Sequence, residues 1–163
     1  MTTFRGALAQ LAGPPVVVPD SFYAATYIYP NFGNVFYDTD GFFNPSEHPD
    51  RIVVPPALVG EYAIVKASCR WSHAEAPPNT RIQILPTRFN GPAGVDSLSG
   101  YPSCAPDNRF FIGGTTADHS SETHPIRLAE GDYFRCALWM SRGNGDGVAM
   151  AVLDVVFSIR ILR

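Results

Sequence analysis

The densest group of metal-ligating residue types in the chain consists of Asp118, His119, Glu122 and His124. Imidazole nitrogens combined with carboxylate oxygens are a ligand set for zinc and related metals. The group falls in a polar stretch that we interpret as a loop, and no second cluster of suitable spacing accompanies it. The pattern therefore favours a solvated loop, and we expect neither a metal nor another cofactor.

Two further kinds of site can be weighed from residue types. Asp38 and Asp40 could bind calcium, but they lack the alternating run of oxygen ligands that calcium loops carry, so a turn is favoured. A hydrolase needs a positioned nucleophile and base, yet the chain has no Gly-x-Ser-x-Gly motif. No Gly-rich phosphate loop precedes a helix. We predict no catalytic residues and no enzyme activity.

Aromatic side chains could stack against a sugar. Trp71 and Trp139 lie in predicted strands, where an aromatic ring is more often part of the core. Tyr101 differs, because it lies in a long loop spanning 90–108 that is rich in Gly, Pro, Ser and Asp. This loop is a candidate ligand site with Tyr101, Asp107, Asn108 and Arg109.

Charge and composition exclude several classes of partner. The net charge is −3, there is one lysine (Lys66), and no basic run exists, so we expect no nucleic-acid binding. No stretch approaches the length of a membrane span, and the N-terminal residues do not resemble a secretory signal. The three cysteines, Cys69, Cys104 and Cys136, are an odd number, which predicts thiols in a reducing cytoplasm.

The elements that must position any site are predicted to be strands. Fifteen prolines interrupt most long helices, and aromatic and β-branched residues are plentiful. Apolar and polar residues alternate over 62–71 and 133–140, and 148–162 forms a closing strand or strand pair. About eight strands separated by turn signals predict an all-β, two-sheet antiparallel sandwich or jelly roll.

Residues 1–20 differ in composition from the rest, because they are mildly apolar and then rich in proline. We interpret them as an N-terminal arm outside a domain of residues 21–163. A rival interpretation makes Val16–Val18 the first strand of the domain. The arm would anchor the chain to a larger particle through Phe4, Leu8, Leu11, Pro14, Pro15, Val16, Val17 and Val18.

A series of motif residues runs through the domain in a fixed order: Phe32, Asp38, Phe43, Val54, Gly60, Tyr62, Gly131, Asp132 and Phe157. This series resembles the globular head of the complement q-subunit family, a tumour-necrosis-factor-like jelly roll. Here the gap from Phe43 to Val54 is longer than usual, and Val54 stands where an aromatic residue is usual. The resemblance implies a ten-strand jelly roll that forms a homotrimer. Gly60 would allow an unusual backbone angle, and Tyr62 would bury its ring.

Residues 36–46 and 51–55 are similar to versions of this motif in tailed-bacteriophage structural proteins. This form implies a virion structural protein, assembled in the host cytoplasm as a capsid decoration or short head fibre. Its partners would be the major capsid protein or another virion protein. The alternative is a receptor- or carbohydrate-binding module at a fibre tip, which would bind a host surface glycan. An enzyme of the cupin type would need a compact His/Glu metal cluster, which the sequence lacks.

Overall fold

The computed structural model describes residues 4–20, 27–72, 80–90, 109–110, 116–142 and 149–162. Within these ranges the chain is almost entirely β-structure, with one short 3-10 turn, η1 (Pro56–Leu58), and no helix long and apolar enough to cross a membrane. The strands are β1 (Gly6–Leu11), β2 (Val16–Val18), β3 (Phe32–Asp38), β4 (Arg51–Val53), β5 (Tyr62–Ser72), β6 (Arg81–Asn90), β7 (Arg109–Phe110), β8 (Thr116–Glu122), β9 (Ile126–Arg127), β10 (Asp132–Ser141) and β11 (Met150–Leu162).

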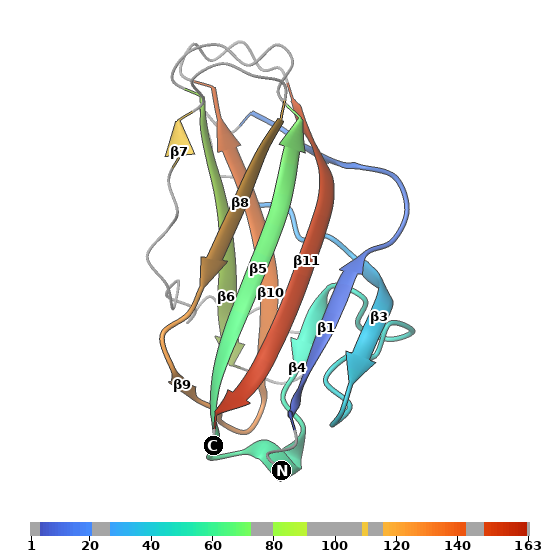
Figure 1. The fold of residues 1–163 in the computed structure, drawn as a ribbon, viewed down its shortest axis with the longest axis vertical. Coiled ribbons are helices and arrows are strands. Elements are labelled where there is room, and N and C mark those ends of the chain that lie inside the picture. Colours follow the sequence, from blue (N-terminus) through green and yellow to red (C-terminus); the bar gives the residue numbers. More distant parts are fainter. Residues whose placement is uncertain are drawn as a thin grey trace.

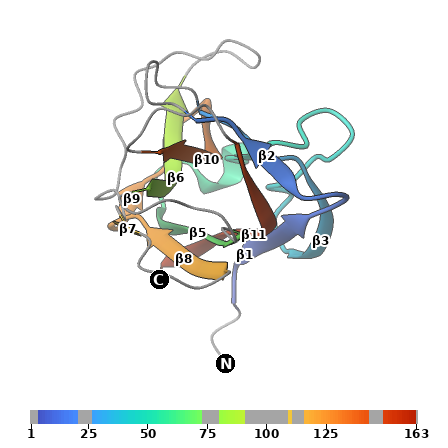
Figure 2. The same cartoon turned by 90° about the horizontal axis from the view of Figure 1, so that it is seen from above.

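The strands form two antiparallel sheets that pack as two layers (Figures 1 and 2). The seven-stranded sheet has the order β3-β1-β11-β5-β8, with β2 paired to β11 and β9 paired to β5. The four-stranded sheet has the order β4-β10-β6-β7. The predicted two-sheet antiparallel jelly roll is confirmed.

The core lies between the sheets because the strands alternate as their sequence predicts. In β5 the side chains of Ala63, Val65, Ala67, Cys69 and Trp71 are buried, and the residues between them face outward. In β10 the inward set is Phe134, Cys136, Leu138 and Met140, each fully buried. The largest fully buried side chains of the domain include Trp71, Phe32, Phe42, Phe89, Phe134 and Phe157.

The interpretation of residues 1–20 as an arm outside the domain is wrong for the two strands in it. β1 lies inside the seven-stranded sheet and pairs with β11 on one side and β3 on the other. Ala7 and Ala9 are fully buried, and Val18 of β2 is also fully buried while pairing with Met150. The rival interpretation, in which Val16–Val18 is the first strand of the domain, is right that these residues form a strand, but β1 precedes it. The small side chains of β1 fit because the core closes tightly over them.

Two other expectations need correction. The polar stretch after residue 118 was predicted to be a loop, but β8 runs through Glu122 and pairs with β5 along its length. The strand predicted over 81–85 continues as β6 to Asn90, past Pro86. In the described part of the chain, β7 pairs with β6 only at Arg81 and Ile82, so Pro86 lies where no described strand pairs with that edge, which is where proline is tolerated.

The family-motif residues mostly occupy the structural roles that the sequence predicts. Gly60 and Gly131 have φ angles of +95° and +78°, which favour glycine. Asp38 ends β3 by accepting hydrogen bonds from four backbone N–H groups, including those of Gly41 at 2.8 Å and Phe43 at 2.8 Å. The side chains of Phe32, Phe43, Val54 and Phe157 are buried in the core.

Candidate functional site

The outer face of the four-stranded sheet is covered by the chain itself. Ile28 and Leu138 exchange two backbone hydrogen bonds of 2.9 Å, which hold the segment before β3 at the edge of β10 and so bring Tyr29 to the outer face. Next to it, the guanidinium of Arg135 lies 3.7 Å from the centre of the Tyr29 ring. Tyr29 packs in turn against Leu85 and Ala137. This face is therefore filled from within one chain.

A stack of arginine and aromatic side chains reinforces this cover. The rings of Phe89 and Tyr133 stack with centroids 5.1 Å apart, and the Arg51 guanidinium lies 4.5 Å from the Tyr133 centroid. The Asp50 carboxylate contacts Arg51 at 3.0 Å and Arg135 at 2.6 Å. Each charge is paired and largely removed from solvent, so these residues hold the cover in place rather than present a binding surface.

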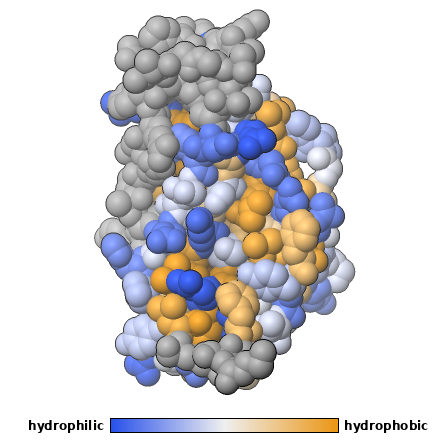
Figure 3. Space-filling view, viewed as in Figure 1, coloured by the Kyte–Doolittle hydropathy of each residue, from blue (hydrophilic) through white to orange (hydrophobic). Residues whose placement is uncertain are grey.

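The outer face of the seven-stranded sheet is different, because its side chains are accessible in the described part of the chain. We call the apolar members of this face the apolar strip: Phe4, Leu8, Tyr37, Tyr62 and Ile64. Phe4 is 48% exposed and Tyr62 is 51% exposed. The Phe4 and Tyr37 rings meet edge to face with centroids 5.3 Å apart. Figure 3 shows hydrophobic and hydrophilic side chains mixed on this face.

Tyr62 does not bury its ring, contrary to the sequence-based expectation. It begins β5 on the outward side of the alternation and pairs with Leu162 and Arg127 on the neighbouring strands. Tyr37 is also on this face, and partial burial raises the pKa of its hydroxyl. Both phenols are therefore suited to contact a second surface through the ring and the hydroxyl together.

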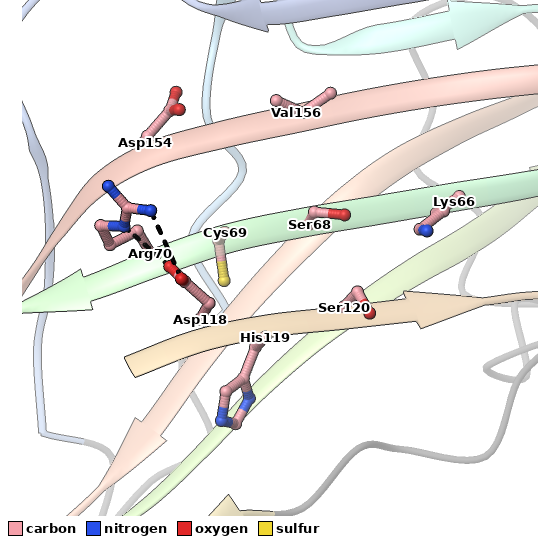
Figure 4. A pocket seen from close by; sticks show the side chains of 9 residues that line it. All are labelled: Lys66, Ser68, Cys69, Arg70, Asp118, His119, Ser120, Asp154 and Val156. Atoms are coloured by element: carbon pink, nitrogen blue, oxygen red, sulfur yellow. Dashed lines mark hydrogen bonds and ion pairs between the residues drawn. The ribbon is translucent and has the colours of Figure 1, made fainter. Parts of the chain in front are cut away.

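Beyond the apolar strip, β11, β5 and β8 line an open depression with a volume of about 510 Å³, which we call the polar hollow. Its outward side chains are Lys66, Ser68, Arg70, Asp118, Ser120, Asp154 and Val156 (Figure 4). Cys69 and His119 also border it, but their side chains are buried on the inner face of the sheet. Serine at two central positions leaves the space between the longer side chains empty.

The register of the strands brings these residues together. In one cross-strand row, Arg70 of β5 lies between Asp154 of β11 and Asp118 of β8. In the next outward-facing row, Ser68 lies between Val156 of β11 and Ser120 of β8. The Arg70 Nε donates to Asp118 at 2.7 Å, and Gln10 Nε2 donates to Asp154 at 2.9 Å. The hydrogen bond from Arg70 lowers the pKa of Asp118 and raises the pKa of Arg70. Both groups are charged at neutral pH.

The predicted metal-ligating residues are divided between surfaces. Asp118 faces outward in the polar hollow, while His119 faces inward and is 4% exposed. Glu122 and His124 are exposed at and beyond the end of β8. No group of three or more His, Cys, Asp or Glu side chains is placed to hold a metal among the residues that the structure describes.

The candidate ligand loop cannot be compared with the structure. Tyr101, Asp107 and Asn108 lie outside the described residues, and Arg109 is described only as the first residue of β7. Cys69 and Cys136 are buried thiols in facing sheets, and Cys104 lies outside the described residues. Burial raises the pKa of the Cys136 thiol well above its usual range, and the nearby Cys69 adds to the shift.

Sequence reasoning missed the polar hollow. Its residues come from three strands that are distant in the sequence, and each of them reads locally as an ordinary outward-facing polar residue. The alternation of β5 was visible and placed Lys66, Ser68 and Arg70 on one face. Nothing local indicated that Ser120 and Asp154 would stand beside them, because β8 was not recognised as a strand.

Comparisons with known proteins identify the fold of the chain but do not identify a family. No protein-family model matches the chain, and no curated protein matches it. Among solved structures it is similar to the globular domain of the zebrafish complement 1qA protein, with a TM-score of 0.53. The match covers 99% of this chain and 98% of that chain at 10% sequence identity. This likeness, together with the two antiparallel sheets, shows that the chain has the complement-type jelly-roll fold.

Proposed function

We propose that the chain is a non-enzymatic module that acts by homotrimeric assembly and binding. The observation that carries this proposal is the contrast between its two outer faces. One face is covered by Tyr29 and the arginine–aromatic stack, whereas the other presents the apolar strip to solvent. Clustered exposed aromatic residues of this kind mark surfaces for contact with another protein.

A closed ring of three copies needs two different complementary surfaces on each copy, because a contact of one surface with itself gives a dimer. The chain offers two such surfaces next to each other. One is the open face of the seven-stranded sheet with Tyr62, and the other is its edge strand β3, where Phe36 is 64% exposed and Val35 is 36% exposed. In the proposed trimer, the β3 edge of one copy packs against the open face of the next.

We further propose that this trimer is a virion structural protein of a tailed bacteriophage, either a capsid decoration or a short head fibre. Residues 36–46 and 51–55 support this assignment, because their form resembles phage structural proteins. Within the first segment, the Asp38 carboxylate accepts hydrogen bonds from the backbone N–H groups of Gly41 and Phe43 at the end of β3. The partner would be the major capsid protein or another virion protein, and the location would be the virion.

The assembly is tested by measuring the mass of the purified chain with light scattering at micromolar concentration. We expect three times the chain mass of 17.8 kDa. Tyr62→Glu and Tyr37→Glu place a charge within the apolar strip and should reduce the mass to that of one chain, with the fold retained by circular dichroism. Val17→Glu is the matched control, because Val17 is 63% exposed on β2 outside the strip. A wild-type mass of one chain would contradict the proposal.

The phage assignment has its own test. Particles purified from a cell that carries the gene should contain the chain, and quantitative mass spectrometry should give a copy number that is a multiple of three. A chain recovered only from the particle-free fraction, with no copies on the particles, would refute the virion role while leaving the trimer intact.

A further inference from the structure

We propose that the polar hollow binds an acidic saccharide, a small sugar that carries one carboxylate. The hollow lies beside the apolar strip and on different side chains, so the inference stands apart from the trimer. It requires only that the hollow remains open when the copies assemble. Its volume of about 510 Å³ lies in the range of small-molecule sites, roughly 300–1,000 Å³.

In this proposal the ammonium of Lys66 binds the anionic group of the ligand. This residue is exposed on β5 and lines one end of the hollow. Among the described residues no hydrogen bond or ion pair engages its ammonium, although Glu122 lies opposite it in the strand register. An unpaired ammonium on a sheet face is available to form a charge-assisted hydrogen bond with a carboxylate.

The other side chains of the hollow would form hydrogen bonds with the hydroxyl groups of the ligand. Ser68 and Ser120 face each other across β5 and β8, and each hydroxyl can donate or accept a hydrogen bond. At the other end, Asp118 is held by Arg70 and Asp154 is held by Gln10, so both carboxylates are fixed as acceptors for sugar hydroxyls. Val156 supplies the apolar contact that the C–H face of a sugar ring needs.

The charge balance selects the class of acid. Arg70 is already neutralised by its hydrogen bonds to Asp118, at 2.7 Å and 3.3 Å, and the Asp154 carboxylate beside it accepts from the neutral amide of Gln10. Lys66 is therefore the available cation at its own end of the hollow, among the described side chains that line it. A phosphate dianion would meet one available cation while approaching Asp118 and Asp154. A single carboxylate matches one ammonium, so a sugar acid fits this site better than a phosphate ester.

The single lysine of the chain allows a direct experiment on the intact protein. Lys66 is the one side-chain amine, so the rate of its acetylation can be read on one peptide by mass spectrometry, with the N-terminal amine as internal reference. Saturating glucuronate should slow acetylation of Lys66 and leave the N-terminal amine unchanged. Glucose lacks the carboxylate and acetate lacks the hydroxyls, so each should protect at least about tenfold less well at equal concentration.

Variants give the second arm of the test, with glucuronate binding measured by calorimetry. Lys66→Met should weaken binding about tenfold, since a hydrogen bond to a charged group is lost, and Lys66→Arg should retain most of it. Arg160→Met is the matched control, because Arg160 is an exposed cation on the same sheet outside the hollow. Both positions are exposed, so circular dichroism should show an unchanged fold for all three variants.

Three results would overturn the inference, and the first two do not depend on the mass of the assembly. The first is equal protection of Lys66 by glucose and glucuronate, and the second is equal loss of affinity in Lys66→Met and Arg160→Met. The third is a difference between two proteins measured without ligand: Lys66 resists acetylation in the wild type but reacts in the single-chain Tyr62→Glu variant. That outcome would show a neighbouring copy over the hollow, which would support the trimer and refute the saccharide site.

Discussion

Replacing Gly6 with alanine should distinguish a core strand from a mobile arm at the start of the chain. Gly6 opens β1 opposite Arg160, with a φ angle of +156°. A Cβ atom at this position would lie 2.1 Å from the backbone oxygen of Ile159. Real Cβ contacts almost never fall below 3.0 Å, so β1 and β11 would have to separate by about 1 Å at this point.

The cost follows from the hydrogen bonds around Gly6, because β1 is held between β11 and the end of β3 and a shift of its backbone strains the bonds on both sides. The Gly6 carbonyl accepts from the Thr39 backbone N–H at 3.0 Å, the Gly6 N–H donates to Thr39 Oγ1 at 2.9 Å, and the Ile161 N–H donates to the Arg5 carbonyl at 3.0 Å. Each such bond contributes about 1 kcal/mol, and the strained backbone adds roughly 1–3 kcal/mol. We expect Gly6→Ala to lower the free energy of unfolding by about 4–6 kcal/mol.

The assay is urea unfolding followed by tryptophan fluorescence, with Gly13→Ala as the control. Gly13 has a φ of +104°, but a methyl group there would meet no other atom within 4 Å, so this variant should lose only about 1–2 kcal/mol from backbone strain. In a mobile arm, glycine to alanine restricts the unfolded chain and would leave stability unchanged or raise it by up to about 1 kcal/mol. A Gly6→Ala protein as stable as wild type would refute the placement of β1.

Three other side chains give predictions of different kinds. Asp132 is fully buried, and its carboxylate accepts hydrogen bonds from Arg88 at 2.5 Å, Asn90 at 2.8 Å and the Ala129 N–H at 2.7 Å. Asp132→Ala should therefore lower the free energy of unfolding in urea by about 3–5 kcal/mol, and Asp132→Asn should lower it less. Cys136 should react with a thiol reagent only after unfolding, because burial raises its pKa; equal rates in buffer and in urea would contradict this. The Arg70–Asp118 pair stabilises the fold above the unfolded-state pKa of Asp118, and this contribution is lost as pH falls through the lowered folded-state pKa. Arg70→Met should therefore raise the Asp118 pKa, measured by carbon-13 NMR, with little change in stability because the pair is exposed.

The parts of the fold that could be predicted are those whose signal is local. In β5 the polar residues from Lys66 onward alternate with buried ones, and in β10 every second residue from Phe134 to Met140 lies in the core. Gly60 and Gly131 were recognisable as turn residues, and both have positive φ angles. The family resemblance placed Phe32 and Phe157 in the core, where their rings stack with centroids 5.4 Å apart.

The parts that could not be predicted depend on pairing between distant residues. β1 reads Gly-Ala-Leu-Ala-Gln-Leu, with no β-branched residue, and it is a strand because β11 and β3 supply partners on both sides. β8 reads Thr-Ala-Asp-His-Ser-Ser-Glu, and its inward residues are His119 and Ser121. Tertiary contacts outweigh the weak local propensity in both strands, and no window of the sequence contains that information.

The same dependence explains why the two outer faces could not be told apart in advance. Both sheets have outward rows of polar and aromatic residues, and each row alone is compatible with solvent. One face is covered because Tyr29, from a distant segment, packs against Arg135. On the other face, the pairing of β5 with β8 and β11 places Ser68 between Ser120 and Val156. Neither arrangement can be read from a single stretch of sequence. A polar side chain facing a filled surface must be paired, as Arg135 is, whereas Lys66 has no partner among the residues that the structure describes. This difference separates the covered face from the open one. Function should therefore be sought first on the face of Tyr62 and Lys66, where an added surface or ligand would meet exposed rings and an available charge.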